Sequence, residues 1–174
     1  MKTAAFGAAL ALALSGVALA QAPAGAPRPP GPPPPPARGP SSAVAVEMAQ
    51  TAVAACAANG YKVTAVVLNS AGVLKVQISA DGAPDMTGQV GVRKAFTVIT
   101  FKSPSGAVGD KAKTDSALAD RSKADPKLIT WAGGEPLMVG GDLIGALGVS
   151  GAPGGDKDDA CAMAAIAKVQ GKLG

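Results

Sequence analysis

The residues that most resemble known catalytic or ligand-binding motifs lie between Val139 and Val169. Gly148-Val149-Ser150-Gly151-Ala152 is similar to the G-x-S-x-G nucleophile elbow, but alanine stands where the final glycine is required. The 174-residue chain contains no histidine, so the commonest general base and metal ligand is missing. A Ser-His-Asp site is therefore excluded.

The glycine-rich stretch 151–155 is not a recognisable phosphate-binding loop. It matches neither G-x-x-x-x-G-K-[ST] nor G-x-G-x-x-G, and the aspartates that follow it discourage an anion. Asp156, Asp158 and Asp159 also do not follow the EF-hand register. We interpret Asp156 as the N-cap of a final helix, and Asp158 and Asp159 as solvated residues of its first turn.

Composition argues against a nucleic-acid partner. The chain has 16 basic and 12 acidic residues, but Lys2, Arg28 and Arg38 precede residue 41, which leaves 13 basic residues against 12 acidic ones beyond that point. One Trp, one Tyr and three Phe provide no stacking platform for bases.

The first 40 residues indicate export followed by a spacer. Residues 1–22 are typical of a secretory signal peptide, with Lys2, an apolar run over 4–14 and the cleavage box Ala18-Leu19-Ala20. A retained membrane anchor is the alternative, but the apolar run is short for a spanning helix. Residues 23–40 contain ten prolines and are predicted to be a polyproline II spacer, or alternatively a ligand for an SH3-like partner. We expect a periplasmic or extracellular protein with no transmembrane segment in the mature chain.

Residues 41–174 are predicted to form a single α+β domain with an antiparallel sheet. Turn chemistry favours a hairpin around Asn69-Ser70-Ala71-Gly72 and another around Gly140-Gly141-Asp142. The expected helices cover residues 41–59, 105–124 and 157–172, and the expected strands cover 62–68, 73–79, 128–131, 136–139 and 143–150. Glycines at 145 and 148 inside the last strand indicate a bulge or a close backbone approach.

Residues 85–101 are ambiguous from local pattern. Phe96-Thr97-Val98-Ile99-Thr100-Phe101 has strand propensity, whereas the apolar residues from Val90 onwards keep helical spacing. The helical pattern is favoured only narrowly.

Four short blocks occur in a fixed order along the chain: Asp81-Gly82-Ala83, Arg93-Lys94-Ala95-Phe96-Thr97, Gly133-Gly134-Glu135-Pro136 and the stretch 144–153. At this spacing they resemble the small haem-binding and haem-degrading domain family, which includes secreted haem-binding proteins and glycolate-operon accessory proteins. The resemblance covers nearly the whole domain. It implies a profilin-like antiparallel sheet flanked by helices, with residues 85–101 helical, and it implies a homo-oligomer.

The same resemblance implies candidate haem contacts. Thr97 occupies the position of the proposed axial contact to iron, and it is the only metal-ligating candidate. Arg93 and Lys94 would pair with the haem propionates, and Phe96 or Phe101 would lie against the porphyrin. The alternative is that Arg93 and Lys94 form a solvated helix face and that Thr97 bonds its own backbone.

Three functions follow as hypotheses. The first is an exported haem- or tetrapyrrole-binding protein that scavenges or senses its ligand. The second is a haem-degrading enzyme, against which the absence of histidine argues. The third is an oligomeric module that binds a small organic acid or another protein without haem. Glycines 133, 134, 140, 141, 145 and 148 are expected to present bare backbone to another subunit, unless they serve only turns.

A disulfide between Cys56 and Cys161 is also predicted. Export would carry the two cysteines of the chain into an oxidising compartment. If the first and last helices pack antiparallel on one face of the sheet, as the resemblance suggests, the two positions come level. Two buried free thiols are the alternative.

Overall fold

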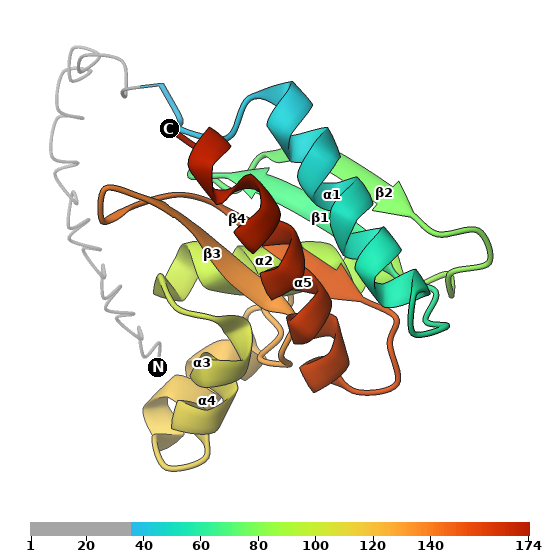
Figure 1. Cartoon of the computed structure of the whole chain (residues 1–174). Helices are drawn as coiled ribbons and strands as arrows, with labels where there is room; N and C mark the ends of the chain where they lie inside the picture. Colours follow the sequence, from blue (N-terminus) through green and yellow to red (C-terminus); the bar gives the residue numbers. More distant parts are fainter. Residues whose placement is uncertain (1–35) are drawn as a thin grey trace, which may run out of the picture. The chain divides into compact units, whose positions relative to one another are not determined.

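The computed structural model describes residues 36–174, which form an α+β domain around one antiparallel sheet (Figure 1). The helices are α1 (Ser42–Ala57), α2 (Thr87–Phe101), α3 (Ser105–Ala112), α4 (Ser116–Ala124) and α5 (Gly155–Val169), with a 3₁₀ helix η1 (Gln170–Lys172) after α5. The strands are β1 (Thr64–Asn69), β2 (Leu74–Ser79), β3 (Gly134–Val139) and β4 (Asp142–Ser150). The predicted fold class is confirmed, and so is the helix at 85–101. The predicted signal peptide and the spacer up to residue 35 lie outside the described residues.

The sheet has the order β2-β1-β4-β3, and every neighbouring pair is antiparallel. Helices α1 and α5 cover one face, whereas α2 lies across the other face with α3 and α4 beyond it (Figure 1). The central strand β1 is buried on both faces because each face carries a helix. Gly140 and Gly141 both have positive φ and make the predicted tight turn between β3 and β4.

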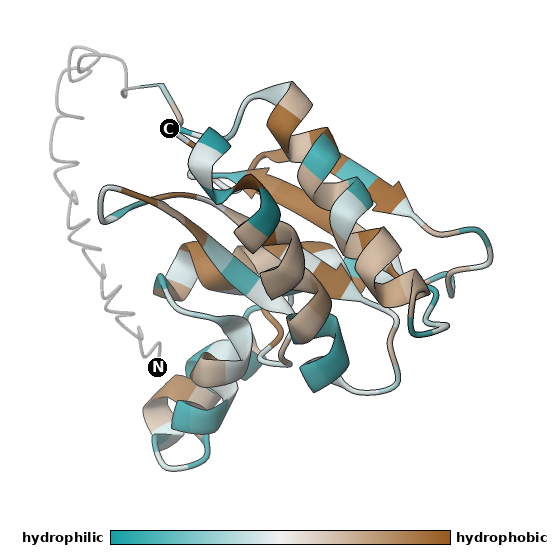
Figure 2. Ribbon diagram, viewed as in Figure 1, coloured by the Kyte–Doolittle hydropathy of each residue, from teal (hydrophilic) through white to brown (hydrophobic). Residues whose placement is uncertain are grey.

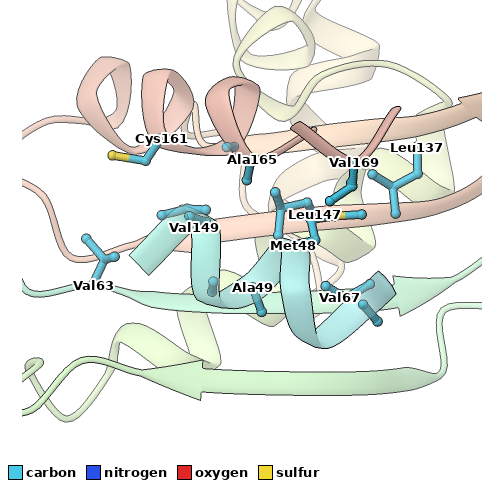
Figure 3. Packing of buried hydrophobic residues seen from close by; sticks show 14 of the residues in the cluster. Met48, Ala49, Val63, Val67, Leu137, Leu147, Val149, Cys161, Ala165 and Val169 are labelled. Atoms are coloured by element: carbon cyan, nitrogen blue, oxygen red, sulfur yellow. The ribbon is translucent and has the colours of Figure 1, made fainter. Parts of the chain in front are cut away.

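Small side chains allow α1 and α5 to pack closely on their face of the sheet. Ser41 caps α1 by accepting a hydrogen bond from the Val44 amide, and alanine suits the interior of the helix. Figure 3 shows Met48 and Ala49 of α1 with Ala165 and Val169 of α5. Val63, just before β1, and four strand residues complete this core: Val67, Leu137, Leu147 and Val149.

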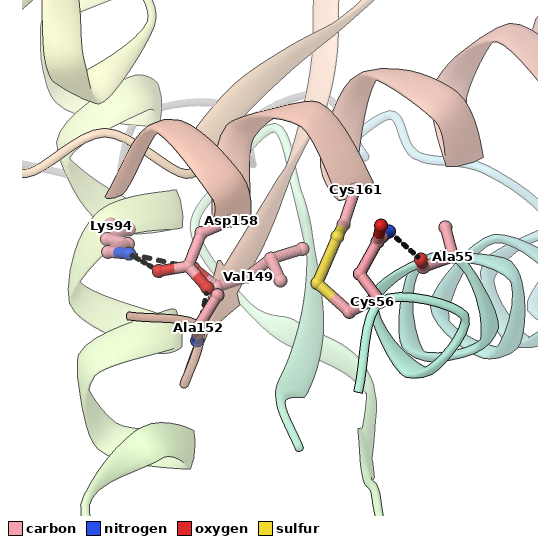
Figure 4. The surroundings of a disulfide bond; sticks show 8 residues. Ala55, Cys56, Lys94, Val149, Ala152, Asp158 and Cys161 are labelled. Carbon is pink, nitrogen blue, oxygen red and sulfur yellow. Dashed lines mark hydrogen bonds and ion pairs between the residues drawn. A yellow bond between two sulfur atoms is a disulfide. The ribbon is translucent and has the colours of Figure 1, made fainter. Parts of the chain in front are cut away.

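The predicted disulfide is confirmed. Cys56 near the end of α1 is bonded to Cys161 in α5, with the two Cα atoms 5.5 Å apart (Figure 4). Both cysteines are buried. The bond therefore fastens together the two helices of one face.

The α2 face has a smaller apolar core. It consists of Val66, Leu68, Ala95, Val98 and Ala146. A Cβ added at Gly148 of β4 would overlap the carbonyl oxygen of Gly91 in α2, so the helix backbone rests directly on the strand backbone. The close approach predicted for this strand is confirmed. Further out, α4 buries no residue fully, and hydrophilic and hydrophobic residues alternate along α3 and α4 (Figure 2).

The predicted strand at 128–131 is wrong. Leu128 and Ile129 are buried, as the apolar pattern suggested, but this segment forms no ladder. Side chains from the helices satisfy its backbone instead: Arg93, Thr97 and Ser105 donate to the carbonyls of Leu128, Ile129 and Trp131, respectively. We call residues 125–133 the anchored loop.

One helix cap and the placement of several glycines also differ from the prediction. The N-cap of α5 is Gly154 rather than Asp156, and Asp156 lies within the first turn. Among the glycines expected at a subunit surface, Gly133, Gly134, Gly145 and Gly148 are buried inside the domain, whereas Gly140 and Gly141 are exposed. The close contacts of the four buried glycines serve packing within the chain.

The end of the predicted spacer is part of the domain. Arg38 forms an ion pair of 2.6 Å with Asp142, and its backbone exchanges hydrogen bonds with Ser70 at 2.9 and 2.8 Å. Residues 36–40 therefore run past both hairpin turns before α1 begins. Between residues 36 and 174, no helix has the length and hydrophobicity needed to cross a bilayer.

Candidate functional site

Helix α2 carries all five residues predicted to contact haem, but it places them in different environments. Arg93 and Phe96 are half-buried and line one groove. Lys94 and Thr97 face inward and are 1% and 0% exposed. Phe101 lies two turns further on, beneath the Arg121 guanidinium at 5.0 Å from the ring centroid.

The groove shared by Arg93 and Phe96 lies between α2 and the anchored loop. Its volume is about 440 Å³, and its lining consists of Gln89, Val92, Arg93, Phe96, Pro126 and Lys127. The Lys127 ammonium lies 5.7 Å from the centroid of the Phe96 ring, within cation–π range. The groove thus combines apolar walls with two cationic side chains.

Arg93 connects the groove to the anchored loop. One guanidinium nitrogen, Nη2, donates to the Leu128 carbonyl at 2.8 Å. The Nε atom is buried and has no hydrogen-bond partner within residues 36–174. The bond to Leu128 therefore positions Arg93, while its Nε–H group has no acceptor within these residues.

Thr97 holds the anchored loop through its hydroxyl group. The oxygen accepts from the Ile129 amide at 2.9 Å and lies 3.0 Å from the Ile129 carbonyl and 2.9 Å from the carbonyl of Arg93. This arrangement matches the alternative in which Thr97 bonds backbone. A ligand can reach the hydroxyl only by displacing the loop, so the role of Thr97 at iron stays a prediction.

Lys94 belongs to a buried ion pair that joins the helices on the two faces. Its ammonium group lies 2.7 Å from the Asp158 carboxylate of α5 and 2.9 Å from the Val149 carbonyl (Figure 4). Asp158 also accepts from the Ala152 amide at 2.9 Å. Burial raises the pKa of Asp158, although the Lys94 ammonium opposes the rise. The pair leaves no part of Lys94 for a propionate at the surface.

The Gly133-Gly134 pair makes room for this ion pair. A Cβ at Gly133 would lie 2.7 Å from the Asp158 Cβ and 2.8 Å from the Lys94 ammonium. The interpretation of Asp158 as a solvated residue is therefore wrong. Three features of the sequence could have indicated this pair: the Gly133-Gly134 block, the acidic start of the last helix, and a lysine at position 94 on the inner face of a helix.

Asp159 and Glu135 form a second acidic contact beside the ion pair. Asp159 accepts from the Gly133 amide at 3.0 Å. Burial, together with a hydrogen bond to Asp159 and its negative charge, raises the pKa of Glu135 to about 8. At neutral pH the Glu135 carboxyl group is therefore largely protonated. No cluster of acidic, cysteine or histidine side chains in residues 36–174 is arranged to hold a metal ion.

Comparison with known proteins identifies the class of domain to which this arrangement belongs. The family model described as haem degrading protein HbpS-like matches residues 41–167. That match spans most of the chain, so the chain belongs to the HbpS-like family. No curated protein sequence is significantly similar to it.

Solved structures agree with this assignment. The crystal structure of HbpS is 29% identical, with a TM-score of 0.69 over 74% of this chain and 89% of that chain. A complex of PduOC with heme is 25% identical, with a TM-score of 0.66 over 72% of this chain and 91% of the other. The ORFY protein of Klebsiella pneumoniae, 21% identical, has the same fold with a TM-score of 0.70 over 75% of this chain and 90% of that chain.

Proposed function

We propose that this chain is an exported protein that binds haem or another tetrapyrrole in the groove between α2 and the anchored loop. The observation that carries the proposal is the pairing of apolar walls, Val92 and Phe96, with the cations Arg93 and Lys127 in one groove. A tetrapyrrole is a flat apolar ring with carboxylate arms. Membership of the HbpS-like family and the heme complex of a relative support this ligand class.

The groove residues suit the ring and its carboxylates better than they suit the iron. Lys127 is free to extend toward a propionate, and Arg93 adds a second positive charge to the lining of the groove. None of the six lining residues is His, Cys, Met or Tyr, the side chains that usually ligate haem iron. Bound haem would supply a redox-active iron, and the protein would bind and orient the ring.

A titration with two porphyrins tests this proposal. Hemin and iron-free protoporphyrin should both give saturable Soret shifts with dissociation constants within about threefold of each other, because the ring and not the metal is recognised. If hemin binds at least tenfold more tightly and Thr97→Ala abolishes the difference, iron ligation by Thr97 is established instead. Affinity no better than that of an unrelated protein would exclude tetrapyrrole binding.

Two phenylalanines provide a matched pair of variants. Phe96→Ala should weaken binding by about tenfold or more, since it removes an aromatic wall of the groove. Phe101→Ala removes a ring of the same helix that lies outside the groove and should leave affinity unchanged. Equal effects of the two substitutions would contradict the location, provided that both variants keep their melting temperatures.

We further propose that the chain binds haem for scavenging or sensing and does not degrade it. The absence of histidine from the whole chain supports binding over turnover. Adding a reductant to the hemin complex in air should leave the Soret band intact. Steady loss of the band with release of iron would instead support a haem-degrading enzyme.

Export and self-association complete the proposal. The signal-like residues 1–22 support delivery to the periplasm or the medium, which cell fractionation would test. A homo-oligomer is expected from the family resemblance. Light scattering that gives a monomer mass at micromolar concentration would contradict it.

A further inference from the structure

A second cavity adjoins the groove, and the two share Arg93 and Pro126 in their linings. Its volume is about 380 Å³, and it is lined by residues from α2, the end of α3, α4 and the loop itself. Leu128 and Ile129 give it an apolar wall. Trp131, whose side chain is among the most exposed large hydrophobic ones at 61%, also lines it.

Two residues that line this cavity carry the unsatisfied buried side-chain atoms found in residues 36–174. These atoms are Arg93 Nε and Ser122 Oγ, and both residues line it. An arginine Nε can only donate a hydrogen bond, and a serine hydroxyl can donate one. Burying such groups without a partner is unfavourable, so two orphans in one cavity call for a shared acceptor.

The charges around the cavity favour an acceptor that is an anion. Arg93, Lys113 and Lys123 line it, against the single carboxylate of Asp125. Asp125 already accepts from the Lys127 amide, and Lys113 lies 2.7 Å from Asp110 at the surface. Arg93 and Lys123 therefore remain as positive groups without an acidic partner.

We propose that this cavity binds a small organic acid, a monocarboxylate with a flat apolar body. The carboxylate accepts from Arg93 Nε and Ser122 Oγ once these two buried atoms turn toward the cavity, and the body lies against Ile129 and the exposed Trp131. The site is separate from the tetrapyrrole groove. Arg93 lines both, whereas Ser122 and Trp131 line only this cavity.

The single tryptophan of the chain gives a direct measurement. Benzoate, added to the purified protein and followed by Trp131 fluorescence excited at about 300 nm, should cause a saturable change. Benzamide, which has the same ring without the charge, should bind at least tenfold more weakly. Ser122→Ala should weaken benzoate binding by about five- to tenfold, and Ser116→Ala, on the same helix but outside the cavity, should not.

Three outcomes would overturn the proposal. These are no saturable change up to 10 mM benzoate by fluorescence or by NMR shifts, equal binding of benzamide, or an affinity unaffected by Ser122→Ala. In the first case ordered water satisfies the two donors. The result is independent of haem, because Phe96→Ala should weaken hemin binding while leaving the benzoate titration intact.

Discussion

The helices on the two faces of the sheet are held by different kinds of interaction. On one face, α1 and α5 pack through alanines, valines and methionine and are joined by the Cys56–Cys161 disulfide. On the other face, α2 has a small apolar core, and polar side chains tie it to the anchored loop. The apolar, cross-linked face leaves little unsatisfied, whereas the polar face holds both cavities described above. Both proposed binding sites therefore lie on the face that is held by polar contacts.

Removing the disulfide should have the largest effect and should act on the first face. It closes a loop with a sequence separation of 105 residues, and the chain-entropy model assigns about 4–5 kcal/mol to such a loop. The Cys56→Ala, Cys161→Ala double variant should lose that stability in urea unfolding. The parent protein in excess reductant should show a similar loss. An unchanged urea midpoint would contradict the bond. Two free thiols per chain in the denatured, unreduced parent protein would also contradict it.

Breaking the buried ion pair should come next, because it joins the two faces. Lys94→Met leaves Asp158 buried and uncompensated, which should cost about 3–4 kcal/mol. The double variant Lys94→Met, Asp158→Leu should recover most of this loss. Lys113→Met breaks an exposed pair of the same 2.7 Å length and should cost less than about 1 kcal/mol. A double variant as unstable as the single one would show that the pair is not the source of the effect.

The anchored loop can be loosened at one hydroxyl group. Thr97→Val keeps the shape of the side chain but leaves the Ile129 amide without its acceptor, which should cost about 1–3 kcal/mol. Hydrogen exchange at the Ile129 amide should speed up in this variant. Thr100→Val is the control, since its hydroxyl donates only to the Phe96 carbonyl within α2. Equal protection of Ile129 in both variants would mean that the loop is held by other contacts.

The smallest expected effect is a dependence of stability on pH, which arises from Glu135 beside the ion pair. Because the folded-state pKa of Glu135 is about 8, the folded protein retains a proton that the unfolded chain loses near pH 4.5. Stability should therefore fall as pH rises from about 4.5 to 8, by about 1 kcal/mol after allowance for the partial exposure of the side chain. Glu135→Gln should flatten this decline and be more stable than the parent at pH 8.

Glu47→Gln is the matched control for the pH series. The hydrogen bond from Lys172 lowers the pKa of Glu47, so any contribution of this residue is lost only in acid below the range tested. Melting curves of the parent, Glu135→Gln and Glu47→Gln from pH 5 to 8.5 test whether Glu135 causes the decline in stability. A decline that persists unchanged in Glu135→Gln would assign it to another group.

Sequence reasoning was most successful where structure is set locally. The cap at Ser41, the two hairpin turns and the apolar spacing of α1 and α5 led to the observed elements. Leu128 and Ile129 were correctly expected to be buried, but their hydrogen bonds go to side chains some 30 residues earlier, which no local pattern shows. The same limit hid the Lys94–Asp158 pair, because the two residues are 64 positions apart. For the candidate site, sequence singled out the helix α2 but not which of its side chains would face outward.

The backbone contact between Gly91 and Gly148 positions α2, and α2 in turn carries one wall of the groove, which neither glycine lines. At this contact backbone rests on backbone, so no side chain lies between α2 and β4 there that could yield to a substitution. A single methyl group at Gly148 would have to lift the helix as a rigid rod, and Val92, Arg93 and Phe96 would move with it. A substitution at Gly148 is thus expected to alter the groove although Gly148 does not line it. Variation in ligand preference among related domains can therefore arise at a buried glycine, with every residue of the groove unchanged.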